Sequence, residues 1–210
     1  DLVRSRGLGD VYKRQELRTT PIAGLLEIFP RVFPDSRGYF FESFRQDWFE
    51  NQGIKENWIQ DNQSFSQKGT VRGLHFQHAP FAQAKLVRVI SGKVLDVVVD
   101  LRRDSPTFGK HFSTILDTEK NNLLYVPAGF GHGFSVLEDA VFVYKCSNYY
   151  HKASEGGVLW NDPELGIAWG VEAPILSEKD QNWPTLEEFK AQNNGCLLYT
   201  SPSPRDRTRS

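Results

Sequence analysis

Short runs of alternating apolar and polar residues, separated by turn residues, occupy the chain from about Leu25 to Trp160. In the run 93–101, KVLDVVVDL, the apolar side chains at 95, 97, 99 and 101 share one face, and Asp96 and Asp100 share the other. This period of two is typical of β-strands. The other clear runs are 38–44, 71–77, 84–90, 122–128 and 140–150.

Turn signals lie between these runs, at 34–38, at Ser91-Gly92 and at 104–106. Many short strands at this spacing predict an all-β fold, an antiparallel barrel of jelly-roll type. Two short helices, polar and peripheral, are predicted at 45–52 and 185–191. The chain has no internal repeat and no long linker, so we expect residues 16–195 to form a single domain with its functional residues in one cavity.

The two ends differ from this pattern. Residues 1–15 and 196–210 lack alternation, are biased towards Arg, Ser and Pro, and resemble translated adapter or vector sequence, so we expect both to be tails foreign to the domain. Together they hold seven basic and three acidic residues, which leaves 18 basic and 23 acidic residues between them, a net charge of −5 against −1 for the full chain. This charge argues against nucleic-acid binding through a basic surface.

Composition adds three further expectations. Fifteen Phe, seven Tyr and five Trp among many β-branched residues favour strands over helices. No apolar run approaches the roughly 18 residues of a membrane span, and residues 1–15 do not have the order of a signal peptide, so we expect a cytoplasmic protein with no membrane partner. Two cysteines cannot form a disulfide framework, and Cys146 lies in an apolar run, where we expect a small buried side chain and not a nucleophile.

Candidate catalytic side chains interrupt the strand-like runs. His75 faces away from its neighbours Leu74 and Phe76, and by itself it is equally well explained as a core histidine with satisfied nitrogens. Lys85 interrupts another apolar run, and because a buried ammonium without a partner is costly, its presence favours a cavity. Tyr144 shares an inward face with its apolar neighbours, although a structural tyrosine remains an alternative.

A histidine motif indicates the type of barrel. Pro127-x-Gly129-x-x-His132 matches the second motif of the cupin superfamily, a turn that delivers a histidine to the barrel interior. Metal-dependent cupins also have a preceding His-x-His and a downstream Glu. Here the corresponding segment offers His75 and His78, which point to opposite faces of a strand, so a transition-metal site is poorly supported and we predict none.

Eight segments in the same order resemble the dTDP-4-dehydrorhamnose 3,5-epimerase family, and the resemblance extends over residues 20–190. It implies a cupin-like jelly roll that epimerises C3 and C5 of dTDP-4-dehydro-6-deoxy-D-glucose to give dTDP-4-dehydro-L-rhamnose in deoxysugar biosynthesis. It also implies a cofactor-independent isomerase that acts as a homodimer on a nucleotide sugar. The segments are DSRGYFFESF (35–44), WIQDNQSFS (58–66), VRGLHFQ (71–77), 83–110, VPAGFGHGFSVL (126–137), YKCSNYY (144–150), EGGVLWNDPELGI (155–167) and LSEKD (176–180).

The resemblance also implies roles for individual residues. His75 would be the general base, Asp180 the carboxylate that holds it, Lys85 a neighbour of the sugar's 4-keto oxygen, and Tyr144 the acid on the opposite face. Among the substrate contacts, Arg37 and Glu42 would contact the nucleotide, in part from the neighbouring subunit, and Tyr150 would stack on thymine. The other implied substrate contacts are Gln60, Asn62, Arg72, His132, Glu155 and Lys179.

These residue types suit proton abstraction beside a ketone. Such a proton is far less acidic than an imidazolium, and each pKa unit of mismatch costs about 1.4 kcal/mol, so the enolate must be stabilised where its charge develops. A lysine ammonium can stabilise it, while a histidine held by a carboxylate can act as the base near neutral pH. Inversion also requires a proton donor on the other face, because return from the same side restores the substrate.

Three alternatives remain open from the sequence. The first is a single-site epimerase, acting at C3 or C5 of a related nucleotide-linked 4-keto-6-deoxy sugar. The second is a metal-dependent cupin, an isomerase or dioxygenase with His75, His78 and His132 as ligands. The third is a non-catalytic module that binds sugar nucleotides.

Overall fold

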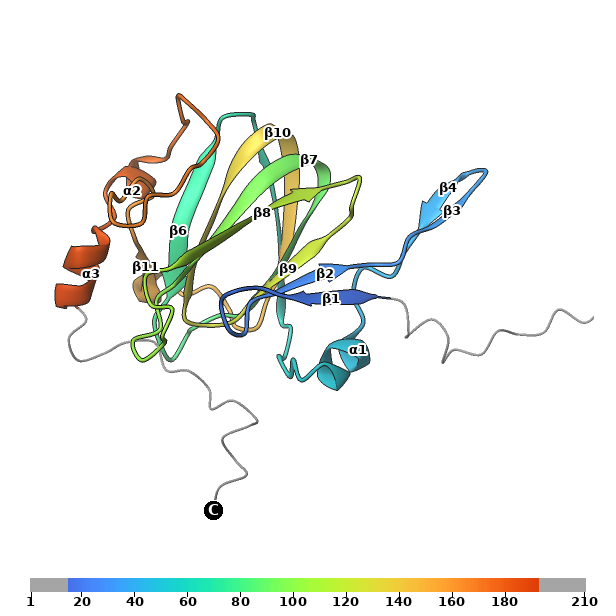
Figure 1. The fold of residues 1–210 in the computed structure, drawn as a ribbon, viewed down its shortest axis with the longest axis horizontal. Coiled ribbons are helices and arrows are strands. Elements are labelled where there is room, and N and C mark those ends of the chain that lie inside the picture. Colours follow the sequence, from blue (N-terminus) through green and yellow to red (C-terminus); the bar gives the residue numbers. More distant parts are fainter. Residues whose placement is uncertain (1–14, 193–210) are drawn as a thin grey trace, which may run out of the picture.

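The computed structural model describes residues 15–192, so the predicted tails 1–15 and 196–210 lie outside the described residues except for Gln15. Strands dominate this part of the chain, and all their pairings are antiparallel, as predicted (Figure 1). The strands are β1 (Glu16–Thr19), β2 (Leu26–Phe29), β3 (Phe33–Asp35), β4 (Gly38–Phe40), β5 (Gln60–Ser66), β6 (Val71–Gln77), β7 (Lys85–Asp100), β8 (His111–Asp117), β9 (Leu123–Val126), β10 (Phe130–Cys146) and β11 (Glu155–Gly157). The helices are α1 (Gln46–Asn51), α2 (Glu178–Gln181), α3 (Leu186–Gln192) and a 3₁₀ turn at Lys152–Ser154.

Two long strands, β7 and β10, run through both layers of the barrel. The second half of β7 and the first half of β10 pair with each other and with β8 and β6, and β11 extends this first layer beyond β6. The first half of β7 and the second half of β10 pair in the second layer, beside β9 and β5. β2 and β1 extend the second layer beyond β9.

The sequence predicted a turn at Ser91-Gly92 that separates two strands. This prediction is wrong, because β7 is one strand that continues from Lys85 to Asp100. Gly92 has a φ of 77°, and a Cβ there would lie 2.1 Å from the carbonyl oxygen of Asp139. The two backbones therefore approach closely where the pairing of β7 with β10 shifts register, and only glycine permits this approach. The turn signal thus marks the bend between the layers.

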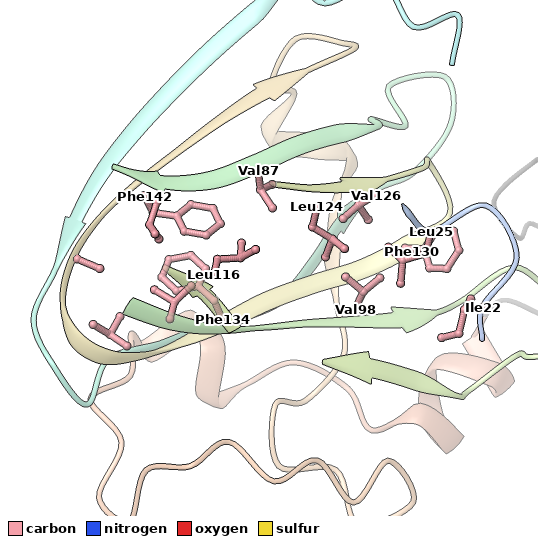
Figure 2. Close-up of a cluster of buried hydrophobic side chains, with 14 residues drawn as sticks. Ile22, Leu25, Val87, Val98, Leu116, Leu124, Val126, Phe130, Phe134 and Phe142 are labelled. Carbon is pink, nitrogen blue, oxygen red and sulfur yellow. The ribbon is translucent and has the colours of Figure 1, made fainter. Parts of the chain in front are cut away.

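Apolar side chains fill the space between the two layers (Figure 2). Val98 and Phe134 come from the first layer, and Val87, Leu124 and Phe142 come from the second. The rings of Phe134 and Phe142 stack at 4.2 Å across this interface. Each fully buried side chain of this size contributes about 1.5–3 kcal/mol, so this cluster is the main cohesion between the layers.

The outer face of the first layer is also buried, under the C-terminal segment. Val97 and Val99 of β7 pack in one cluster with Trp169 and with Leu186 and Phe189 of α3. Both faces of the second half of β7 are therefore inside the protein, and its aspartates, Asp96 and Asp100, are fully buried. The alternation of apolar and polar residues in this half of β7 was predicted correctly, but the polar face is not exposed to solvent.

Helices α1 and α3 confirm the two predicted helices to within a residue at either end. They are not simply polar, because α1 buries Trp48 and Phe49 and α3 buries Leu186 and Phe189. These apolar residues cover parts of the outer faces of the barrel. The four-residue helix α2 was not predicted.

A hairpin of β3 and β4 projects away from the barrel as an arm (Figure 1). The predicted run 38–44 is a strand only at Gly38–Phe40, because the arm pairs with nothing else among the described residues. Arg37 lies in its turn, and Tyr39 and Phe40 expose 59% and 69% of their surface. These two adjacent aromatic residues give the arm an apolar surface, and contiguous apolar surface of this kind can mark an interaction site.

Two smaller expectations concern the rest of the described chain. None of its helices is long and apolar enough to cross a membrane. Cys146 is 1% exposed, as predicted for a small buried side chain, and burial raises the pKa of its thiol.

Candidate active site

Two adjoining cavities of about 240 and 310 Å³ share His75, Lys85, Tyr144, Tyr150 and Glu155, and we treat them together as the central cleft. The cleft lies between the two layers of the barrel. Its lining includes Phe134 and Phe142 of the core cluster, so the polar side chains of the cleft border the packed apolar core.

The two layers supply different functional groups to the central cleft. His75 comes from β6 in the first layer, where it pairs with His132 on β10. Lys85 and Tyr144 come from the second layer, on the paired halves of β7 and β10. The imidazole of His75 is thus carried by one layer, and the ammonium and the phenol are carried by the other.

His75 is held by a carboxylate from a distant part of the chain. Its Nε2 contacts Oδ1 of Asp180, which is 3% exposed and lies on α2. Ser177 donates to Oδ2 of the same carboxylate at 2.8 Å and accepts from the Asp180 amide at 3.1 Å, which caps α2. Both carboxylate oxygens therefore have a partner.

The ionisation of Asp180 follows from its contacts. Burial favours a high pKa for Asp180, but the hydrogen bond and charge of His75 and the hydrogen bond of Ser177 outweigh it, and the pKa lies below its ordinary value. An ionised carboxylate only accepts, so a neutral His75 donates from Nε2 and keeps its lone pair on Nδ1. That nitrogen is the available base.

Burial shifts the pKa values of Lys85 and Tyr144 in opposite directions, because it disfavours the charged form of each. Burial lowers the pKa of Lys85, against the nearby Cys146, Asp96 and Glu155, which favour its charged form. Its ammonium makes no hydrogen bond within residues 15–192. Burial, and then Cys146, raise the pKa of Tyr144, so this phenol keeps its proton at neutral pH.

A second histidine–carboxylate pair lies deeper in the barrel. His132 Nε2 is 2.9 and 3.0 Å from the two carboxylate oxygens of Asp96, and both side chains are buried. Burial raises the pKa of Asp96, although the charges of His132 and Lys85 favour its ionised form. Sequence reasoning missed Asp96 as a site residue, and the only signal was a charged residue on one face of a strand whose other face is apolar.

Polar residues that are partly exposed form the mouth of the central cleft. Glu155 accepts from Lys179 at 2.6 Å and from the hydroxyl of Tyr150 at 3.1 Å. Arg72 donates from Nε to Ser66 at 3.0 Å. The predicted residues that line the cleft are His75, Lys85, Tyr144, Gln60, Asn62, Arg72, His132, Tyr150, Glu155 and Lys179.

Of the other three predicted residues, Asp180 does not line the cleft but contacts His75, whereas Arg37 and Glu42 lie outside it. Arg37 pairs with Asp35 in the turn of the arm, and 88% of its side chain is exposed. Glu42 follows the arm and lies 3.4 Å from Arg45. A single copy of the chain therefore does not bring Arg37 and Glu42 to the other predicted residues.

Within residues 15–192, no three His, Cys, Asp or Glu side chains are grouped so that they could hold a metal ion. His75 and His132 each face a single carboxylate, and His78 does not line the central cleft. The metal-dependent alternative therefore has no ligand set in this part of the chain.

Comparisons with known proteins identify relatives of this chain. The family model for dTDP-4-dehydrorhamnose 3,5-epimerase matches residues 19–188. The dTDP-4-dehydrorhamnose 3,5-epimerase of Shigella flexneri is 51% identical, over 78% of this chain and 91% of that protein. An epimerase from Legionella pneumophila, solved in complex with dTDP-4-keto-L-rhamnose, superposes with a TM-score of 0.84 at 41% identity and covers 90% of this chain and 100% of that one. A 3'-monoepimerase from Streptomyces bikiniensis, solved in complex with dTDP-quinovose, superposes with a TM-score of 0.78 at 39% identity and covers 86% of this chain and 91% of that one.

Proposed function

The chain belongs to the dTDP-4-dehydrorhamnose 3,5-epimerase family, and we propose that His75, Lys85 and Tyr144 carry out the family's reaction in it. The protein is a cupin-like isomerase with dTDP-4-dehydrorhamnose 3,5-epimerase activity in dTDP-rhamnose biosynthesis. One observation supports the assignment of residues above all others. A carboxylate-held imidazole faces an ammonium and a phenol that come from the opposite layer of the same cleft.

The first step is abstraction of a proton beside the ketone. His75 Nδ1 takes the proton from the carbon next to C4, and the electron pair of the broken C–H bond forms an enolate with its negative charge on the C4 oxygen. The Asp180 carboxylate stabilises the imidazolium that results. Lys85 stabilises the oxyanion with a charge that the fold holds in place before the reaction.

The second step is proton return to the other face. Tyr144 donates its phenolic proton to the same carbon, the enolate collapses to the ketone, and the configuration is inverted. Its raised pKa keeps the proton in place until the enolate forms. Proton exchange with solvent restores neutral His75 and protonated Tyr144, and the cycle then repeats at the second carbon.

Contacts far from the reacting carbon orient the sugar. We expect Tyr150 to stack on the thymine, and Arg72 and Arg37 are suited to the diphosphate because a guanidinium can hold two oxygens at once. The remaining predicted contacts, Gln60, Asn62, His132, Glu155 and Lys179, border the same cleft. Binding energy from these remote groups can hold the C–H bond in line with His75.

The pH dependence of kcat tests the role of Lys85. Because only the charged ammonium stabilises the enolate, kcat should fall as pH rises through the lowered pKa of Lys85, below the ordinary lysine value of about 10.4. Lys85→Arg should be slower but should lack this alkaline limb, since arginine stays charged. Lys190→Arg, at an exposed pair with Glu164, is the matched control and should keep the normal profile. An alkaline limb that persists unchanged in Lys85→Arg would assign it to another group.

The alternatives differ from this proposal in what they require. A single-site epimerase would use the same base at one carbon, as the similarity to a 3'-monoepimerase allows, and only the number of exchanging carbons distinguishes the two. A binding module would not need His75, Lys85 and Tyr144 to converge, whereas proton transfer requires it. The convergence of these residues therefore favours an epimerase over a binding module, and the match to the 3,5-epimerase family favours inversion at both carbons.

We also propose a homodimer in the cytoplasm, in which the arm of one subunit lies on its partner. The exposed Tyr39 and Phe40 of the arm, and the exposed Phe65 and Ile90 on the second layer, offer apolar surface for such contact. The arm would then bring Arg37 to the partner's cleft, which explains why Arg37 lies far from its own.

Mixed dimers test this arrangement. Arg37→Ala and His75→Asn should each be impaired as pure dimers, Arg37→Ala by about tenfold in kcat/KM, which is the loss of one charge-assisted contact. Mixing them by unfolding and refolding should restore activity, since one cleft in each hybrid combines an intact His75 with the partner's intact Arg37. No recovery in mixtures whose dimeric mass is verified by light scattering would contradict the exchange of arms.

A further inference from the structure

The buried side chain of Gln77 makes three hydrogen bonds that join two loops. It lies on β6 two residues after His75 and is 5% exposed. Its Nε2 donates to the carbonyl oxygens of Phe81 at 2.6 Å and Tyr149 at 3.1 Å. Its Oε1 accepts from the His151 amide at 2.7 Å. Both hydrogens of the amide group and its oxygen are therefore satisfied by backbone atoms outside β6.

The two loops, 78–84 and 147–154, are also joined at both ends. At one end Ala84 and Ser147 exchange hydrogen bonds of 2.8 and 3.0 Å. At the other end the His78 amide donates to the carbonyl of Ser154 at 2.8 Å. Between these ends the rings of Phe81 and His151 stack in parallel at 3.9 Å, and the buried amide of Gln77 lies at the centre of the joined pair.

Tyr150 lies between the two backbone groups of the second loop that Gln77 holds. The carbonyl of Tyr149 and the amide of His151 flank it, and its own amide donates to Gln60 at 2.9 Å. Tyr150 is 54% exposed, and within residues 15–192 the one hydrogen bond of its side chain is that of its hydroxyl group to Glu155. The backbone on either side, and not packing of the ring, therefore determines where this aromatic surface stands.

We propose that Gln77 is a positioning residue for nucleotide recognition, which sets Tyr150 at the mouth of the central cleft. The inference rests on the proposed function, in which Tyr150 stacks on the base of the nucleotide. β6 then has two tasks two residues apart, because it carries the base His75 and it fixes the loop that receives the nucleotide. Because His75 and Gln77 lie at a fixed separation on one strand, the position of the bound nucleotide determines where the sugar lies relative to the imidazole of His75.

The effect of losing Gln77 should appear in nucleotide binding. Without its amide, two carbonyls and one N–H beside the buried Gln77 side chain lose their partners, so the loops must rearrange or admit water. Part of the binding free energy would then be spent on ordering Tyr150. We expect the Kd for dTDP to rise about tenfold, with kcat at saturating substrate within about threefold of the unmodified enzyme.

The experiment measures dTDP binding by calorimetry, together with kcat and KM, in full-length Gln77→Ala and Gln77→Met. The Met variant keeps the volume of the side chain, so it replaces the Ala variant if circular dichroism shows that Gln77→Ala fails to fold. Asn148→Ala is the matched control, because the amide of Asn148 bonds Pro80 across the same loops at 3.1 Å but is exposed to water. Its Kd should stay within about twofold of the unmodified value, since water replaces an exposed bond at little cost.

A folded Gln77 variant with the unmodified Kd for dTDP would overturn the inference, as would one that loses kcat at saturation while its Kd is unchanged. Equal weakening by Asn148→Ala would also overturn it, because the effect would then not depend on the buried amide. An unmodified enzyme that turns over substrate but does not bind dTDP would contradict the proposed nucleotide site instead, so the two failures are distinguishable.

Discussion

Replacing His75 by Asn is expected to lower kcat by about 10³-fold and to leave the affinity for dTDP nearly unchanged. General base catalysis contributes about 10²–10⁴-fold. The other histidine that lines the central cleft, His132, cannot substitute, because it is turned to Asp96 and lies deeper. Asparagine retains a polar group of similar shape beside Asp180, so the cleft should keep its structure. Single-turnover measurement of product formation, with calorimetry for dTDP, checks both parts.

The matched control for this variant is His111→Asn. His111 is an exposed histidine on β8, outside the central cleft, so its replacement should leave kcat within about twofold, as is usual for surface substitutions. A His75→Asn enzyme that keeps more than a tenth of the normal kcat would show that the base is another group, and the proposed mechanism would fail.

Replacing Tyr144 by Phe is expected to separate two events that the normal enzyme couples. His75 and Lys85 remain, so the enzyme should still abstract the proton and exchange it with solvent deuterium on the same face. Without the phenol no donor serves the opposite face, and net epimerisation should fall by about 10²–10³-fold. Deuterium in unchanged substrate, followed by NMR beside product formation, measures the two rates separately.

Tyr125→Phe provides the comparison for the loss of a buried tyrosine hydroxyl group. Tyr125 is buried and donates to Glu56 at 2.9 Å, within the cluster that contains α1, and it does not line the central cleft. This variant should lose some stability and retain the normal ratio of exchange to epimerisation. If exchange and epimerisation decline together in Tyr144→Phe, the phenol acts before the enolate forms and the assigned role is wrong.

The fold was predictable because period-two patterns and turn residues are local signals. They gave the antiparallel all-β class and helices α1 and α3. They did not reveal that β7 passes through both layers, because Gly92 serves a close approach to Asp139 and this approach depends on a strand far away in sequence. Alternation also cannot tell that both faces of a strand are covered, as happens on β7 under the C-terminal segment.

The site was predictable where a charged residue breaks an apolar pattern, and otherwise only through family resemblance. Lys85 is conspicuous in its strand, whereas Asp180 stands in a polar stretch and contacts His75 only because α2 packs beside β6. α2 has four residues, too few for any periodicity, and its start depends on the cap supplied by Ser177. Asp96 and Gln77 went unrecognised because their partners lie on other strands and loops.

The most direct test of the central claim is NMR of dTDP-4-keto-6-deoxyglucose incubated with the unmodified enzyme in heavy water. If His75 removes protons beside the ketone and Tyr144 returns them to the other face, deuterium should enter both C3 and C5, and the labelled product should be inverted at both. The absence of label at either carbon would contradict proton abstraction in the central cleft, and label at one carbon alone would contradict the double epimerisation.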